Sequence, residues 1–188
     1  TGRRIGYDFL VVATGSHLDY AQIEGMDVAA IGRDGVGSVY ASAQAAQATW
    51  GAMQAFVERG GDALMTLPAT PIKCAGAPIK MTFMLCDRLA RAGTLQRSKV
   101  VFESALGSVF GVKVVADRIL EHWRRLDVEV EYNERLAAID IGARRASFVS
   151  PEGERTEKRY DFIHVVPPQR APDAVRQSAL AWQEGPFA

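Results

Sequence analysis

Hydrophobic positions along the chain follow two spacings, one typical of helices and one of buried strands. Apolar residues at 46, 50, 53 and 57 share one helical face after Ser42, which suits a helix N-cap, and two glycines at 60–61 end the run. Residues 78–92 and 112–123 repeat the helical pattern, with Pro78 in a first turn and Gly93 at the end of the earlier helix. Apolar runs of strand length lie at 63–67, 99–106 and 128–132.

Strand, helix, strand, helix, strand is the order of a βαβαβ unit, which forms a right-handed parallel sheet. Residues 136–141 and 146–150 predict a β-hairpin around Gly142, and residues 159–166 predict a last strand before Pro167 and Pro168. The pattern therefore predicts an α/β fold, a Rossmann-like three-layer domain with a parallel βαβαβ core plus a β-hairpin. This arrangement resembles the second dinucleotide-binding-type domain of two-domain flavoproteins.

The two ends of the chain differ from this central region. Residues 7–12 form an apolar run followed by small residues, which predicts a buried strand feeding a tight turn, and residues 16–41 are rich in Gly and Asp and predict a linker. We therefore divide the chain into a remnant strand and linker (1–41), a Rossmann-like domain (42–168) and the start of a return to a first domain (169–188). The chain begins at Thr1, and residues 182–188 add no closing element, so we expect a piece of a longer protein.

Composition narrows the function classes. The 22 Lys and Arg residues balance the 22 Asp and Glu residues, so no strong field points to nucleic acid. No apolar run approaches the ~20 residues that cross a bilayer. Two cysteines and three scattered histidines indicate neither a disulfide framework nor a metal site, so we expect no metal.

The turn after the first strand of the βαβαβ unit departs from the pattern of nucleotide-binding folds. Such a turn normally carries several glycines, which let a pyrophosphate contact backbone amides at a helix N-terminus. Residues 68–78 contain one glycine, Gly76, and three prolines, which lack amide donors. The sequence therefore predicts that this turn does not bind NAD(P)H.

The same turn carries Cys74, which directly follows Lys73 and precedes the expected helix start. The positive end of the helix dipole and the neighbouring ammonium favour the thiolate, which is the reactive form of cysteine. The alternative is a buried cysteine that packs as a small hydrophobe, and position alone leaves both open. Cys86 lies in the middle of an apolar helix and is expected in the core. A disulfide between the two is not expected, because a helical rise of ~12 Å separates the helix start from Cys86.

Several motifs carry a resemblance to one family. Residues 70–80, Thr-Pro-Ile-Lys-Cys-Ala-Gly-Ala-Pro-Ile-Lys, resemble the redox-cysteine loop of sulfide:quinone oxidoreductases. Residues 7–15, Tyr-Asp-Phe-Leu-Val-Val-Ala-Thr-Gly, are similar to the strand and turn that approach FAD in this superfamily, and the stretches at 107–113 and 164–168 stand in family order. The likeness runs from about residue 7 to residue 173.

The resemblance implies an activity and a cofactor. Members of this family hold FAD, oxidise sulfide to a cysteine-bound persulfide with two redox cysteines, and pass two electrons through FAD to membrane quinone. On this mapping Cys74 is one of the redox pair, and Ala13, Thr14 and Gly15 bring backbone to FAD. Lys80 places a positive charge near the flavin or the reacting sulfur; the alternative is a solvated lysine on the first turn of the helix.

Departures from the family pattern limit what this chain does alone. The chain has no G-x-G-x-x-G motif, no second redox cysteine of the family and no C-terminal amphipathic region, the part that seats such enzymes on a membrane surface and forms the quinone site. We therefore expect the chain alone to be inactive, with peripheral membrane association belonging to the full-length protein. Alternatives are a flavocytochrome-type sulfide dehydrogenase, an NADH:quinone reductase-like flavoprotein and an inert scaffold domain. An oligomer is compatible with the sequence.

Overall fold

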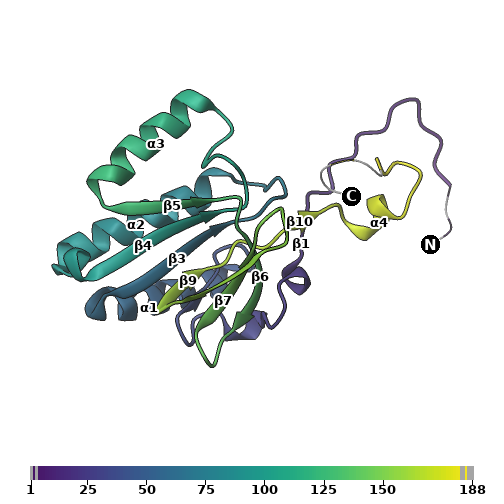
Figure 1. Cartoon of the computed structure of the whole chain (residues 1–188). Coiled ribbons are helices and arrows are strands. Elements are labelled where there is room, and N and C mark those ends of the chain that lie inside the picture. The colour runs from purple at the N-terminus through teal and green to yellow at the C-terminus, as the bar shows by residue number, and fades with distance from the viewer. Residues whose placement is uncertain (1, 3, 183–184, 186–188) are drawn as a thin grey trace.

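A five-stranded parallel sheet forms the centre of the computed structural model, which describes residue 2, residues 4–182 and residue 185. Its strands lie in the spatial order β2-β9-β3-β4-β5 (Figure 1). The bounds are β2 (Val36–Gly37), β9 (Phe162–His164), β3 (Gly61–Leu67), β4 (Ser98–Ser104) and β5 (Val128–Tyr132). The long strands β3 and β4 are buried on both faces, which explains their continuous apolar runs.

Three helices cover one face of this sheet (Figure 1): α1 (Ala43–Arg59), α2 (Gly76–Ala92) and α3 (Lys113–Arg125). The Ser42 side chain accepts a hydrogen bond from the backbone N of Ala45 at 3.0 Å and so begins α1. Gly93 ends α2 in the left-handed conformation, with φ of 70°, and the 3-10 helix η3 (Leu95–Arg97) leads on to β4. The predicted helix termini at Ser42 and Gly93 are confirmed.

An antiparallel sheet covers the opposite face. Its strands are β6 (Arg135–Asp140), β7 (Arg145–Val149) and β8 (Arg155–Arg159), and Phe148 packs with Leu64 and Val101 of the central sheet. The predicted three-layer α/β fold with a βαβαβ core and a hairpin is confirmed. The last strand predicted for residues 159–166 is the shorter β9, which pairs parallel with β3, whereas β8 before it was not predicted and pairs antiparallel with β7.

Residues 16–41 are more ordered than a linker. They form β1 (His17–Leu18), the 3-10 helices η1 (Tyr20–Gln22) and η2 (Val28–Ala30), and β2. Glu24 bridges to Ala138 of β6, and a Cβ on Gly25 would overlap the carbonyl oxygen of Ile139. With φ of 74° at Gly25, only glycine suits this close approach of the segment to β6.

The buried strand predicted for residues 7–12 is wrong. The segment is exposed and unpaired among the described residues, and the side chains of Phe9 and Val11 are 93% and 86% exposed. A strand needs a neighbouring strand for its backbone hydrogen bonds, and apolar pattern alone does not supply one. Figure 1 shows this N-terminal segment beside the short helix α4 (Asp173–Arg176), away from the central sheet.

The chain returns toward its N-terminal segment after β9. Strand β10 (Gln169–Arg170) pairs antiparallel with β1, and α4 follows it. Most of the stretch after Trp182, predicted to lack a closing element, lies outside the described residues. In the part of the chain that the structure describes, no helix is both long and apolar enough to cross a membrane. The three-way division at residues 41 and 168 stays a prediction.

Candidate active site

Three neighbouring parallel strands bring their following segments together at one edge of the sheet. Tyr40 follows β2, Gln169 follows β9, and Cys74 lies in the loop after β3. Because β2, β9 and β3 are adjacent and parallel, their carboxyl ends meet at the same edge, where α/β sheets commonly bind ligands. The topology therefore creates a cluster from residues that are far apart in the sequence.

Cys74 is exposed and free, just before Gly76, the first residue of α2. Its carbonyl oxygen accepts hydrogen bonds from the Tyr40 hydroxyl at 2.8 Å and from the backbone N of Ala77 at 3.1 Å. The sequence left open whether Cys74 is an accessible thiol or a buried cysteine, and in the structure it is accessible. Its backbone is fixed while its side chain is open to solvent.

Cys86 is fully buried on α2 in the core between the helices and the sheet, as predicted. Burial raises the pKa of its thiol to about 11, so at neutral pH the thiol stays protonated. Both cysteines are free. Of the two, Cys74 alone therefore combines exposure with a position at the ligand-binding edge of the sheet.

Tyr40 is a site residue that the sequence analysis missed. Its side chain is 7% exposed, and the Lys73 ammonium lies 5.9 Å from the centre of its ring. Burial, with a smaller contribution from nearby Cys74, raises the pKa of Tyr40, so its hydroxyl remains a hydrogen-bond donor. The available signal was a large aromatic residue in a segment otherwise typical of a linker.

The predicted cofactor-binding residues lie beside the Cys74 loop. Ala13, Thr14 and Gly15 line a hollow of about 390 Å³ together with Lys73. The lining also includes residues of β10, of α4 and of the link between them, namely Arg170, Ala171, Pro172 and Val175. Gly15 has φ of 72°, a conformation that favours glycine, and this agrees with the predicted tight turn. The structure thus brings the turn and the cysteine loop into one neighbourhood.

Gln169 joins these two parts through its side chain. Its Oε1 accepts hydrogen bonds from the Ser16 hydroxyl at 2.7 Å and from the backbone N of Lys73 at 3.0 Å. Its backbone N donates to the hydroxyl of Thr70 at 2.9 Å. The residue is 1% exposed. The sequence analysis missed it, although its position directly after Pro167 and Pro168 was a signal for the crossing out of the sheet.

Lys80 lies apart from this cluster. It is exposed on α2 and does not line the hollow beside Gly15. No hydrogen bond or ion pair within the described part of the chain engages its ammonium. Both sequence interpretations of Lys80, a charge near the reaction and a solvated surface lysine, fit this position.

His164 is buried in β9 with no hydrogen-bond partner for either ring nitrogen within the described residues. Burial lowers its pKa to about 4, so the ring is neutral at physiological pH. Across the described residues, no group of three or more His, Cys, Asp or Glu side chains is arranged to hold a metal ion. His164 is therefore a neutral side chain buried within the central sheet.

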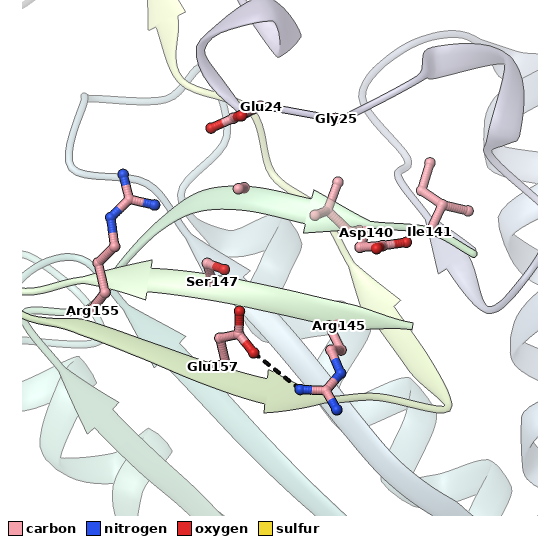
Figure 2. A pocket seen from close by; sticks show the side chains of 10 residues that line it. Glu24, Gly25, Asp140, Ile141, Arg145, Ser147, Arg155 and Glu157 are labelled. Carbon is pink, nitrogen blue, oxygen red and sulfur yellow. Dashed lines mark hydrogen bonds and ion pairs between the residues drawn. The ribbon is translucent and has the colours of Figure 1, made fainter. Parts of the chain in front are cut away.

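A larger hollow, of about 560 Å³, lies on the outer face of the antiparallel sheet (Figure 2). Figure 2 shows Arg145 and Glu157 pointing toward each other, and their ion pair measures 3.0 Å. Glu24, Asp140 and Arg155 add further charge around the opening. No cysteine or histidine lines it, so the larger hollow does not coincide with the candidate redox chemistry.

Comparisons with known proteins indicate which family this chain resembles. No protein-family model matches the chain. The mitochondrial sulfide:quinone oxidoreductase of Mus musculus is 36% identical over 187 residues, which cover 98% of this chain and 41% of the relative. The chain thus spans about two fifths of the length of the curated relatives it matches.

Solved structures show the same fold. The sulfide:quinone oxidoreductase of Aquifex aeolicus superposes with a TM-score of 0.72 and 20% identity, over 93% of this chain and 39% of that one. A chain in the mitochondrial ATP synthase structure of Tetrahymena thermophila superposes with a TM-score of 0.77, also at 20% identity, over 96% of this chain and 45% of that one. Over nearly its whole length this chain is similar in sequence to part of the sulfide:quinone oxidoreductases, and it shares the fold of that part.

Proposed function

We propose that this chain forms the redox-cysteine region of a sulfide:quinone oxidoreductase, with Cys74 as a sulfur carrier. The observation that carries the proposal is the accessible Cys74 thiol beside a turn whose residues, Ala13, Thr14 and Gly15, line a shared hollow with Lys73. An accessible thiol is needed because sulfur exchange requires direct attack between sulfur atoms.

The residues present fit a flavin cofactor. Gly15 offers exposed backbone in a left-handed turn, and it lines the hollow beside the Cys74 loop. Ala13, Thr14 and Gly15 would hold the cofactor through their backbone. FAD, when bound, supplies the two-electron acceptor for the reaction.

The proposed chemistry joins sulfide to Cys74. The thiolate sulfur and HS⁻ form one S–S bond, giving a cysteine persulfide, and together they lose two electrons and one proton. These two electrons would be accepted by FAD held at the turn of Ala13, Thr14 and Gly15, with quinone as the final acceptor, and the second redox cysteine is contributed by sequence outside this chain. The chain's own part is to hold the Cys74 backbone through Tyr40 and Ala77, so that the sulfur faces solvent.

The loop after β3 supports a sulfur-based rather than an NADH-based electron source. Gly76, its single glycine, has open space where a Cβ would lie, so no close backbone approach requires glycine there. A pyrophosphate cradle depends on such close approaches. For Lys80 we propose a positive charge near the reacting sulfur, which its exposed ammonium allows. Peripheral membrane attachment belongs to the proposal for the full-length protein.

The test is an assay of the natural-length protein for sulfide-dependent reduction of a water-soluble quinone. Cys74→Ser should abolish the reaction, because serine cannot carry a persulfide, whereas Cys86→Ala should keep it because Cys86 is buried in the core. Lys80→Met should lower the rate if its charge acts near the sulfur. Reduction of cytochrome c with no quinone reduction would favour the flavocytochrome alternative, and NADH-driven turnover the NADH:quinone reductase alternative. Absence of all three reactions would indicate a scaffold.

A further inference from the structure

Gln169 occupies a position that a polar side chain rarely takes. Its side chain is 1% exposed, and it is the first residue of β10, which follows the carboxyl end of β9 in the chain. Glutamine is mostly found on protein surfaces, because burial of an amide requires hydrogen-bond partners. A buried glutamine is therefore explained by what its amide contacts.

The orientation of the amide follows from its partners. The backbone N–H of Lys73 can only donate, so the atom that faces it at 3.0 Å must be the acceptor Oε1. The Ser16 hydroxyl donates to the same oxygen at 2.7 Å. The Nε2 has no partner within the described residues. Both side-chain hydrogen bonds of Gln169 within the described residues thus depend on one oxygen.

That oxygen connects three distant parts of the sequence. Ser16 directly follows the turn at residues 13–15, and Lys73 directly precedes Cys74. On the other side of the loop, the carbonyl of Cys74 is held by the Tyr40 hydroxyl. The peptide units on both sides of Cys74 are therefore fixed, one by Tyr40 and one by Gln169. The contact with Gln169 also reaches the turn at residues 13–15 through Ser16.

We infer that Gln169 is a positioning residue that couples the turn at residues 13–16 to the Cys74 loop through its Oε1. The role of this coupling rests on the proposed function, in which it holds the Cys74 sulfur at a fixed distance from the turn that would bind the cofactor. The coupling itself is a property of this chain and needs neither sulfide nor flavin. A displacement of the turn is transmitted to the backbone of residue 73 through a single acceptor atom.

The experiment measures hydrogen exchange of the Lys73 amide by NMR in this chain. Gln169→Met keeps the volume but removes the acceptor, so the amide should exchange about fivefold to tenfold faster. Gln169→Glu keeps an acceptor oxygen at the same place, so it should restore the slow exchange in the folded chain, although burial of the carboxyl lowers stability. Gln54→Met, an exposed glutamine on α1, is the matched control and should change nothing.

A double-mutant cycle with Ser16→Ala tests the coupling. Alone, Ser16→Ala should speed the Lys73 exchange about twofold to fivefold, because the shared oxygen loses one of its two donors. In the Gln169→Met background it should have no further effect. Equal effects of Ser16→Ala in both backgrounds, or slow exchange retained in Gln169→Met, would overturn the inference.

A companion assay separates this inference from the proposed function. In the natural-length protein, Gln169→Met should lower kcat for sulfide-dependent quinone reduction about tenfold and leave the KM for quinone unchanged, while Gln169→Glu should recover most of the rate. If the exchange results hold but the wild-type protein oxidises no sulfide, the coupling stands and the proposed function fails. If sulfide is oxidised but Gln169→Met exchanges like wild type, the positioning role is wrong.

Discussion

The two cysteines of this chain share a chemistry but lie in opposite surroundings. Cys86 is on the buried side of α2, where side chains of α1, α3 and the sheet exclude water. Cys74 precedes the same helix in a loop whose backbone is held by Tyr40 and Gln169 contacts while its side chain is exposed. The comparison teaches that the solvent accessibility of a thiol here depends on whether it lies in the loop before α2 or on the buried face of that helix.

The two regions are also held together differently. The core around Cys86 depends on apolar packing, for example Phe102 against Trp123 with ring centres 4.7 Å apart. The edge around Cys74 depends on a few hydrogen bonds between segments distant in sequence. Packing of this kind contributes several kcal/mol per large side chain, whereas a single hydrogen bond contributes about 1 kcal/mol.

Thiol labelling of the native chain gives the largest expected difference between the regions. At pH 8 a thiol whose pKa is about 11 is ionised in only about one molecule in 1000, and Cys86 is also fully buried. Cys74 should therefore react with iodoacetamide at least about 100-fold faster than Cys86, as followed by peptide mass spectrometry. Both should react in urea, and comparable native rates would show that the core is not closed.

Removal of a large core side chain should lower the free energy of unfolding far more than removal of an exposed side chain near Cys74. Phe102 is fully buried against Trp123, so Phe102→Ala should lower the free energy of unfolding by about 3–5 kcal/mol. Lys80→Ala, on the exposed side of α2, should change it by less than about 0.5 kcal/mol. Urea unfolding followed by circular dichroism measures both, and a small loss for Phe102→Ala would contradict the packing described for this core.

His164, between the core and the edge, should make the fold sensitive to acid. Its folded-state pKa of about 4 lies below the ordinary value of 6.5, so the unfolded chain takes up a proton first as the pH falls. The stability it contributes is complete above pH 6.5 and is lost as the pH falls toward 4. Between pH 7 and pH 5 the loss should be about 2 kcal/mol.

The matched variant is His164→Met, which removes the titrating ring and its two unpaired nitrogens. Its free energy of unfolding should depend less on pH over the same interval, by about 2 kcal/mol. Urea unfolding at pH 7 and pH 5 gives the comparison. The same slope in the variant and the parent would assign the acid sensitivity to other groups.

Loss of one hydrogen bond at the edge should give the smallest effect. Tyr40→Phe removes the donor to the Cys74 carbonyl, which still accepts from the backbone N of Ala77. Labelling of Cys74 should then speed up by no more than about fivefold, with stability lowered by about 1 kcal/mol. Tyr132→Phe, an exposed tyrosine on β5, should leave both quantities unchanged. A much larger loss would mean that Tyr40 supports the core rather than the loop.

Local pattern predicted most of the fold and part of the site. The helices after Ser42 and before Gly93, the strands of the βαβαβ unit and the buried position of Cys86 all follow from spacing and end signals. Cys74 was found because its loop carries a recognisable motif. Residues 7–12 were misjudged because an apolar run indicates a strand but does not show that a partner strand is present.

The sequence by itself determined which segments become helices and strands, since periodicity and capping act within a few residues of chain. Tertiary structure alone decided that Tyr40, Gln169 and Cys74 meet. These residues follow β2, β9 and β3, and only the order of strands in the sheet makes them neighbours. The physical reason is that side-chain hydrogen bonds between distant segments leave no periodic signal, because each depends on the three-dimensional path of the whole chain.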